Sequence, residues 1–308
     1  MTNNKKSYKY LIAGAASAII WGFFSIPLRN LKQLQYNAEE ILIYRVITSL
    51  LLIWLAAVFF RRDKIRQDVQ YIKGLSTPKR RRVLWLSILA CLLVTANWFS
   101  FIYVVNNVSL RAGAFAYMVC PLLTALGGYF FLKEHLNKLK FISIGLALVS
   151  IFLLAMGFYQ EVVWSVFVAV LYAGYLIIQR TIQNIDKFNF LGIQLFFSSF
   201  FIIPLVIAHP HAFPMQVAFW INILIISIFF TIVPLYLSLY ALIGITSSTL
   251  GILIYINPII AFAVAFFYFH ETVNSIQILS YGSLLLAVVV FNWEYIKKLK
   301  PSSAVIES

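Results

Sequence analysis

The sequence has few charged residues. Only 11% of its 308 residues are Asp, Glu, Lys or Arg, whereas 62% are hydrophobic. Soluble domains have roughly 25% charged and roughly 45–50% apolar residues, and one soluble core of this size could not bury so much apolar surface. The composition therefore excludes a soluble fold and a disordered chain, and it indicates a protein that folds in lipid.

Cysteines and enzyme motifs are also scarce. The two cysteines, Cys91 and Cys120, lie in apolar runs, so neither a disulfide framework nor a cysteine metal site is implied. There is no G-x-x-x-x-G-K-[ST] phosphate loop, no H-E-x-x-H motif and no G-x-S-x-G motif. His209 and His211 could bind a metal, but an exposed loop fits them better. We therefore expect no enzyme activity, no cofactor and no metal site.

Carboxylates are missing from the middle of the apolar runs. All ten Asp and Glu residues lie in loops, in tails or at the ends of these runs. A buried carboxylate that carries protons through the bilayer is therefore not available, and a cationic solute would find no buried counter-charge. Glu161, in a short turn, could still couple to protons at the mouth of a cavity.

Ten apolar stretches are long enough to cross a bilayer as helices, which takes about 20 residues. We therefore predict an all-α polytopic membrane protein with ten transmembrane helices. The first stretch follows three lysines and resembles a signal peptide, but nine further stretches favour a retained first helix. The predicted spans are residues 8–30, 39–60, 83–106, 110–133, 138–158, 160–182, 188–209, 216–242, 247–270 and 274–296.

Positive charge is concentrated on one side of this topology. If the N-terminus is cytoplasmic, the cytoplasmic segments hold 20 Lys and Arg residues and the external segments hold three. Because Lys and Arg gather on the cytoplasmic side of membrane proteins, we predict that both termini are cytoplasmic. Nine of the 20 lie in one loop, residues 61–82. This loop is predicted to contact anionic lipid head groups rather than nucleic acid, because the charge excess lies on one membrane face.

The two halves of the sequence resemble each other. Several residues recur at a constant offset of 137, and each half holds five predicted spans. An odd number of spans means that the second half enters the membrane from the opposite side. We therefore predict two inverted five-helix repeats, residues 1–158 and 159–308, as in many secondary transporters. The matching pairs are Tyr103/Tyr240, Pro121/Pro258, Phe130/Phe267, Glu134/Glu271, Asn137/Asn274 and Gly145/Gly282.

The paired prolines lie near the middle of their spans. Pro121 and Pro258 each lack an N–H, which frees the carbonyls of Tyr117 and Ile254. In hydrocarbon these carbonyls need other partners or must face a wet cavity. Two interpretations stay open, a packed proline kink and a pair of hinges beside a central binding site.

Arg45 is the one ionisable residue that lies clearly inside a predicted span, and such residues are candidates for function. Glu40 lies five positions earlier, so the helix offers no i,i+4 ion pair. The long side chain could reach the interface by snorkelling, or it could act in the cavity as a gate or in an ion pair with another helix. Both interpretations stay open.

Polar and aromatic residues near mid-membrane are the candidate substrate contacts. Hydrogen bonding between helices explains the asparagines equally well, and packing is the commoner role for the aromatics. Asn137 and Asn274, with Glu134 and Glu271, are predicted to cap or orient the following helices. The candidate substrate contacts are Trp21, Asn97, Trp98, Tyr117, Tyr172, Tyr175, Tyr240, Tyr255 and Asn257.

Several segments carry a family resemblance. WGFFSIPLRNL at Trp21, AEEILIYRVITS at Ala38, NWFSFIYVVNN at Asn97, AYMVCPLLTALGGYFFLKEHL at Ala116 and TIVPLYLSLYALIGITSSTLGILIYINP at Thr231 resemble the RarD branch of the EamA-type drug/metabolite transporters. The resemblance implies a ten-helix permease of the bacterial inner membrane, with inverted repeats and a cavity lined by spans 1, 3, 4, 6, 8 and 9.

This chain departs from the RarD pattern near the implied cavity. Thr48 stands where the family often has Trp, and Asn257 where Gly is usual, so substrate identity is not transferred. We favour a transporter that exports a small neutral or zwitterionic metabolite, amino acid or drug-like solute by alternating access. A receptor or scaffold that does not transport is the alternative, and a lipid-modifying enzyme would need a His, Asp or Glu cluster that the sequence lacks. A homo-oligomer is also compatible with the sequence.

Overall fold

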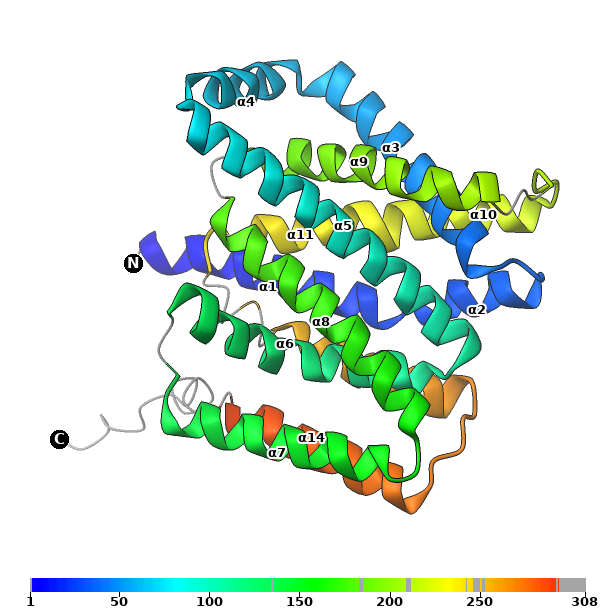
Figure 1. Ribbon diagram of the computed structural model, residues 1–308. Helices are drawn as coiled ribbons and strands as arrows, with labels where there is room; N and C mark the ends of the chain where they lie inside the picture. The colour runs from blue at the N-terminus through cyan, green and yellow to red at the C-terminus, as the bar shows by residue number, and fades with distance from the viewer. Residues whose placement is uncertain are drawn as a thin grey trace.

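The computed structural model describes residues 2–133, 136–182, 185–208, 212–241, 243–245, 250, 253–291 and 293. The regular elements of these residues are helices, labelled as in Figure 1. The first half of the chain holds α1 (Thr2–Gly22), α2 (Ser25–Gln33), α3 (Ala38–Phe60), α4 (Arg62–Gly74), α5 (Thr77–Asn107), α6 (Leu110–Leu132) and α7 (Lys138–Ala155). The second half holds α8 (Tyr159–Thr181), α9 (Lys187–Ala208), α10 (Val217–Ser227), π-helical η1 (Ile228–Ile232), α11 (Val233–Ala241), α13 (Ile256–Ala263), π-helical η2 (Val264–Tyr268) and α14 (Ser275–Phe291).

The protein is an all-α polytopic membrane protein, as predicted. Eight helical spans among the described residues are long and apolar enough to cross a bilayer, and two shorter apolar helices, Ile256–Tyr268 and Ser275–Phe291, follow them. Helices satisfy every backbone hydrogen bond within one segment, which a lipid environment requires. Most observed helix ends lie within about three residues of the predicted spans, but α1 and α5 begin six residues earlier. Residues 247–270 and 274–296 are helical over shorter described ranges.

The basic segment at residues 61–82 is not a loop, which corrects the prediction. It forms α4 and the first turns of α5, with none of the α4 side chains buried. Asp63 in the first turn and Lys73 in the last turn of α4 complement the helix dipole. The high charge suggested a loop, but Lys, Arg and Gln are good helix formers. Figure 1 shows α4 at the same end of the bundle as the start of α1 and the end of α14. This end is called the α4 end below.

Helix packing follows an exchange of the two halves. By their order in the two halves, α1 corresponds to α8, α5 to α11 and α6 to α13. The contact of α6 with α8 therefore matches that of α13 with α1, and the contact of α5 with α8 matches that of α11 with α1. α7 packs against α14, and α3 against α9, so these pairs are their own counterparts. α1 and α8 run in opposite directions across the bundle (Figure 1). This pairing is what a pseudo-two-fold axis in the membrane plane produces.

The ends of corresponding helices also match at the predicted offset. Lys133 and His270 both adopt the left-handed conformation, with φ of 55° and 51°. Asn137 accepts a hydrogen bond from the Lys140 backbone N–H, and Asn274 accepts one from the Gln277 N–H, so both asparagines cap the next helix as predicted. Glu134 lies outside the described residues.

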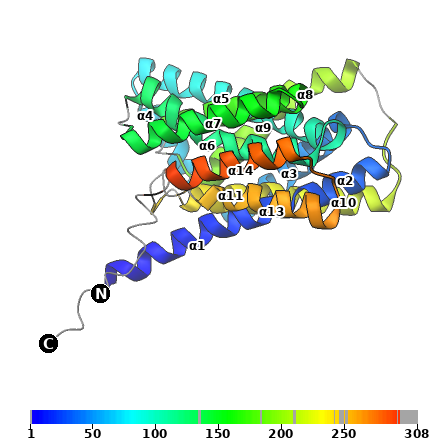
Figure 2. The same cartoon turned by 90° about the horizontal axis from the view of Figure 1, so that it is seen from below.

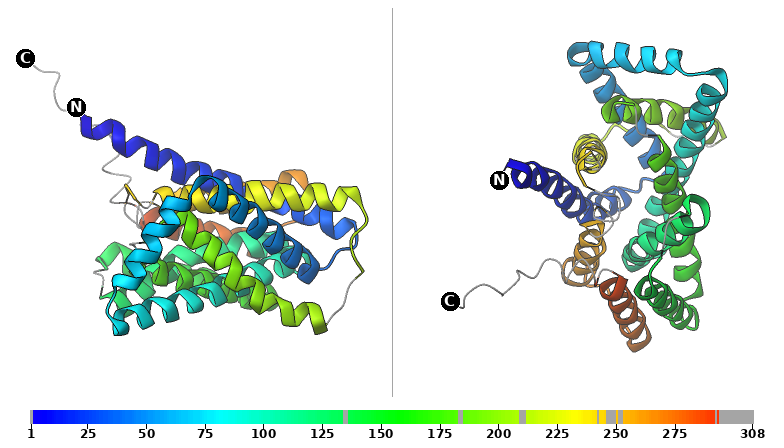
Figure 3. Two further views of the ribbon diagram at one scale, coloured as in Figure 1. Left: turned by 90° about the horizontal axis from the view of Figure 1, so that it is seen from above. Right: turned by 90° about the vertical axis from the view of Figure 1, so that its left-hand side faces the viewer.

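The transmembrane helices form two layers, seen edge-on in Figures 2 and 3. One layer contains α1, α11 and α13, and the other contains α5 and α8. Gly22 allows α1 and α13 to approach closely, because a Cβ atom at this position would lie 2.5 Å from the Ile260 Cβ. Each layer therefore combines helices from both halves of the chain.

Prolines mark most of the helix irregularities. Pro27 stands two residues after the start of α2 and lacks an N–H for the Phe23 carbonyl, which explains the break between α1 and α2. Pro258 follows a turn at Tyr255, and α13 begins at Ile256. Pro121, by contrast, lies inside the continuous helix α6. The two related prolines therefore have different backbones, and their role as hinges stays a prediction.

Candidate functional site

A pocket lies between the two layers, near the middle of the bundle. It takes residues from both halves and from seven of the predicted spans, including span 2, which the resemblance did not imply. The empty space among the lining residues is about 430 Å³, and only a small part of it is wide enough for water. This central pocket is lined by Trp21, Phe24, Arg45, Trp98, Phe101, Tyr117, Tyr172, Leu235 and Asn257.

Arg45 provides the charge in the central pocket. Its residue is 2% exposed, so the side chain does not snorkel to the interface. Its Nε donates a hydrogen bond of 2.7 Å to Thr231 Oγ1, whereas Nη1 has no partner among the described residues. The guanidinium carbon lies 4.9 Å from the ring centroid of Phe24 and 4.8 Å from that of Trp98. Within the described part of the chain Arg45 forms no ion pair, so the ion-pair interpretation finds no support there.

The π-helical turn η1 holds Arg45 in place. Thr231 Oγ1 donates to the Ile226 carbonyl at 3.0 Å and accepts from Arg45 Nε. Ser227 Oγ, one turn earlier, donates to the Arg45 backbone carbonyl at 3.3 Å. Both hydroxyls are completely buried. Two polar side chains of the second half therefore fix both ends of an arginine that belongs to the first half.

Trp21 is fixed by a proline of the second half. Its Nε1 donates a hydrogen bond of 3.1 Å to the Phe230 carbonyl. That carbonyl lies four residues before Pro234, which has no N–H to offer it. Ser17 Oγ adds a bond of 2.9 Å to the Pro234 carbonyl. Trp21, in the wall of the pocket, thus donates a hydrogen bond to the Phe230 carbonyl, for which Pro234 has no N–H.

The remaining wall is mostly aromatic. The ring centroid of Tyr117 lies 5.2 Å from that of Phe101 and 5.6 Å from that of Tyr172, both at steep interplanar angles. Asn257 reaches the pocket from the second residue of α13, and it is 4% exposed. The pocket therefore combines one guanidinium, two phenols and one amide with apolar rings.

Four of the predicted substrate contacts do not line the central pocket. Asn97 donates to the Val168 carbonyl at 2.9 Å, an interhelical hydrogen bond between α5 and α8. The Tyr175 hydroxyl lies 3.3 Å from Gln194 Oε1, and Tyr240 packs against Tyr10 with ring centroids 5.1 Å apart. Tyr255 is buried at the turn before α13. The pocket does include Trp21, Trp98, Tyr117, Tyr172 and Asn257.

Some residues of this site were not predicted from the sequence. These are Phe24, Phe101 and Leu235, which line the pocket, and Thr231, which accepts a hydrogen bond from Arg45. Phe24 and Thr231 lie in motifs that carry the family resemblance, but nothing in their residue types set them apart from 28 Phe residues and many hydroxyls.

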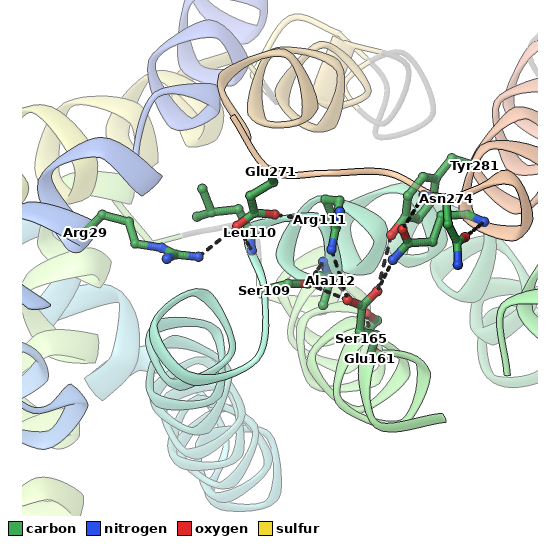
Figure 4. Close-up of polar contacts among 11 residues, drawn as sticks. Arg29, Ser109, Leu110, Arg111, Ala112, Glu161, Ser165, Glu271, Asn274 and Tyr281 are labelled. Atoms are coloured by element: carbon green, nitrogen blue, oxygen red, sulfur yellow. Dashed lines mark hydrogen bonds and ion pairs between the residues drawn. The ribbon is translucent and has the colours of Figure 1, made fainter. Parts of the chain in front are cut away.

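A second polar cluster lies at the bundle end opposite α4. It consists of Arg29, Arg111, Glu161 and Glu271 and is called the ion-pair cluster (Figure 4). Arg29 Nη2 lies 2.9 Å from Glu271 Oε1, and Arg111 Nε lies 3.5 Å from Glu271 Oε2. Arg111 Nη2 lies 3.7 Å from Glu161 Oε1. Charges of alternating sign therefore join α2 and α6 of the first half to α8 and the η2–α14 connection of the second.

Hydrogen bonds at helix starts position the two carboxylates. Ser109, the N-cap of α6, donates to Glu161 Oε1 at 3.0 Å. Glu271 follows His270, and its own N–H bonds the Ala265 carbonyl at 3.0 Å, which ends η2. Glu271 Oε1 accepts from the Leu110 N–H at 3.3 Å. Glu271 therefore caps α6, which corrects the prediction that it orients the helix after it.

At the α4 end a different set of contacts joins the halves. Arg61 Nη2 lies 2.8 Å from Asp186 Oδ2, and Asn189 Nδ2 donates to Asp68 Oδ2 at 2.6 Å. These contacts link the α3–α4 junction and the middle of α4 to the start of α9. In the described part of the chain, no group of three or more His, Cys, Asp or Glu side chains could hold a metal ion.

Comparison with known proteins gives a consistent result. The pattern of the EamA-like transporter family matches twice, over residues 8–156 and 160–293. The chain is 27% identical over 304 residues to the uncharacterized transporter YojE of Bacillus subtilis, covering 96% of this chain and 97% of YojE. It is 26% identical over 302 residues to the protein RarD of Streptomyces exfoliatus, covering 97% of this chain and 92% of that protein.

A solved structure shares the fold. One protein crystal structure superimposes on this chain with a TM-score of 0.63 at 14% sequence identity. The match covers 92% of this chain and 98% of the other. At this level of identity the likeness supports the architecture alone.

Thr231 offers a test of the support behind Arg45. We expect Thr231→Val to lower the free energy of unfolding by about 1–3 kcal/mol, because it leaves the buried Nε without its acceptor. Thr231→Ser keeps the hydroxyl and should lie close to wild type. The measurement is the thermal unfolding of purified protein in detergent. Thr181→Val, at an exposed threonine, is the matched control, and an equal loss in this control would contradict the assignment.

Proposed function

We propose a function for this chain, which belongs to the EamA-like transporter family and is of the RarD type. It exports a small organic solute across the bacterial inner membrane by alternating access. The central pocket is the observation that carries the proposal. It lies in mid-bundle between the halves and presents polar groups there. Transporters built from inverted repeats bind their solutes near the midplane, at the interface of the repeats.

The exchange symmetry of the packing supports alternating access. The main helix contacts map onto one another when the two halves are exchanged. Each half can therefore adopt the conformation of the other while the same pairs of corresponding helices stay in contact. Such an exchange moves the opening of the pocket from one membrane face to the other.

The ion-pair cluster is suited to act as a gate in this cycle. Its members are partly exposed, with side-chain exposure between 10% and 28%, so water can solvate them when they separate. Ion pairs that keep some contact with water attract each other less strongly than fully desolvated ones. The cluster can thus hold one end of the bundle closed and still open at modest cost in free energy.

Orientation is part of the same proposal. The charge distribution supports an orientation in which the α4 end and both termini are cytoplasmic, and the ion-pair cluster then faces outward. α4 lies where its basic side chains can contact anionic lipid head groups.

Transport is tested with protein reconstituted in liposomes. Solute uptake from a panel of amino acids, organic acids and neutral aromatic compounds should exceed that of protein-free liposomes. Trp98→Ala, in the pocket, should lower the rate about tenfold, because it removes a wall and a cation–π contact. Trp85→Ala lies on the same helix but is 61% exposed and should stay within about twofold of wild type.

Folded protein that transports no member of the panel would contradict the proposal. It would favour the receptor or scaffold alternative. Equal loss of transport in Trp85→Ala and Trp98→Ala would remove the central pocket from the pathway.

The gate is tested by Glu271→Gln, which keeps the shape but removes the partner of Arg29 and Arg111. The readout is a single cysteine in the pocket, introduced as Leu235→Cys after Cys91 and Cys120 have been changed to Ala. Its rate of labelling measures how easily a reagent reaches the pocket from outside. Glu271→Gln should raise its rate of labelling by a membrane-impermeant maleimide about threefold, because each ion pair is weak. Asp63→Asn, at an exposed carboxylate of α4, is the control. An unchanged rate in Glu271→Gln would show that the cluster is not the gate.

Orientation is tested with two thiols in cells whose outer barrier is permeable to the reagent. Asn107→Cys is exposed at the ion-pair end and Gln70→Cys is exposed on α4. An impermeant maleimide should label Asn107→Cys in intact cells and Gln70→Cys only after the inner membrane is opened. The reverse pattern would invert the topology.

A further inference from the structure

Arg45 has features that packing does not explain. It is a cation at the eighth residue of the 23-residue helix α3, 2% exposed, and it forms no ion pair with any described residue. An unpaired charge inside a membrane protein is costly and is retained where it serves a function. Removing it would leave an apolar, aromatic pocket that packs more easily.

The surroundings of Arg45 leave one part of the guanidinium available. Nε is bound to Thr231, and the rings of Phe24 and Trp98 lie beside the guanidinium. Nη1 has no partner, and Arg45 lines the central pocket. Guanidinium groups bind carboxylates through paired N–H donors in a planar fork. A guanidinium whose orientation is already fixed loses little freedom when it binds such an anion.

The other lining residues define the rest of the solute. Trp21, Trp98 and Phe101 offer ring surface, and Leu235 offers aliphatic surface. The hydroxyls of Tyr117 and Tyr172 and the amide of Asn257 can serve one further polar group. No carboxylate lines the described pocket, so an ammonium group would find no opposite charge there.

We propose that the transported solute is an organic monoanion, with a carboxylate bound to Arg45 and an apolar or aromatic body among the rings. This inference rests on the proposed transport function and narrows it. It replaces the sequence-based expectation of a neutral or zwitterionic solute, which considered the missing carboxylates and not the buried cation. Arginine suits the role because the planar fork of its N–H donors matches the two oxygens of a carboxylate.

Four related probes separate the possible charges, namely phenylacetate, phenylacetamide, phenylalanine and phenethylamine. Binding to the purified full chain in detergent is followed by the change in total tryptophan fluorescence, to which Trp21 and Trp98 in the pocket contribute. Phenylacetate should bind at least about tenfold more tightly than phenylacetamide, because a hydrogen-bonded charge pair replaces neutral contacts. Phenylalanine and phenethylamine should bind more weakly than phenylacetate.

Variants of Arg45 test the residue itself. Arg45→Met should abolish the preference for phenylacetate over phenylacetamide, and Arg45→Lys should keep part of it, because the charge remains while the fork is lost. Arg66→Met changes an exposed arginine of α4 and should keep the full preference. Thermal unfolding adds a second readout: without bound anion, Arg45→Met should be no less stable than wild type, because a buried unpaired charge is replaced by an apolar side chain of similar length.

The outcomes separate this inference from the transport proposal. If phenylacetamide binds as tightly as phenylacetate, or if phenylacetate does not bind at all, the inference is wrong. If liposomes transport a neutral solute equally well with Arg45→Met, the inference is wrong and the transport proposal stands. If folded protein transports nothing, the transport proposal fails first. Should Arg45→Met not fold, the wild-type comparison of the two probes decides.

Discussion

A positive charge fixed in a low-dielectric interior is the constraint on which the centre of this protein depends. The Arg45 guanidinium does not reach water, so neighbouring groups must stabilise it. The structure uses one hydroxyl, from Thr231, and two ring faces, from Phe24 and Trp98. These groups come from three separate segments. Three segments of the chain thus contact the buried guanidinium, and its Nη1 still has no partner among the described residues.

Proline irregularities surround the same place. Trp21 and Phe24 flank the break before Pro27, Leu235 follows Pro234, and Asn257 precedes Pro258. A missing N–H leaves a carbonyl that lipid cannot satisfy, so these positions turn toward polar partners. Trp21 meets this need at Phe230. At Pro234 the backbone therefore brings a polar side chain, that of Trp21, into the wall of the pocket.

The sequence predicted the elements well and their contacts poorly. Apolar length located the spans, and the 137-residue offset located matching helix ends such as Asn137 and Asn274, because both properties are local. The partner of Arg45 was not predictable, since Thr231 is distant in sequence and ordinary in type. Glu271 was assigned to the helix after it because no local pattern points to Leu110. The resemblance supplied most of the cavity spans, while Arg45 added span 2.

The ion-pair cluster and the central pocket share the same rigid elements. Arg111 stands six residues before Tyr117 on α6, about 9 Å along a helix axis, and Glu161 begins the helix that carries Tyr172. Arg29 lies on α2, just after Phe24. Because packed helices move as rigid bodies rather than deform, separating the charges at the end of the bundle must also displace aromatic walls of the pocket. An anion at Arg45 would draw the same walls together. In the proposed transport cycle, ligand binding and closure of the ion-pair cluster are therefore two effects of one helix motion, and no additional signal between the two sites is required.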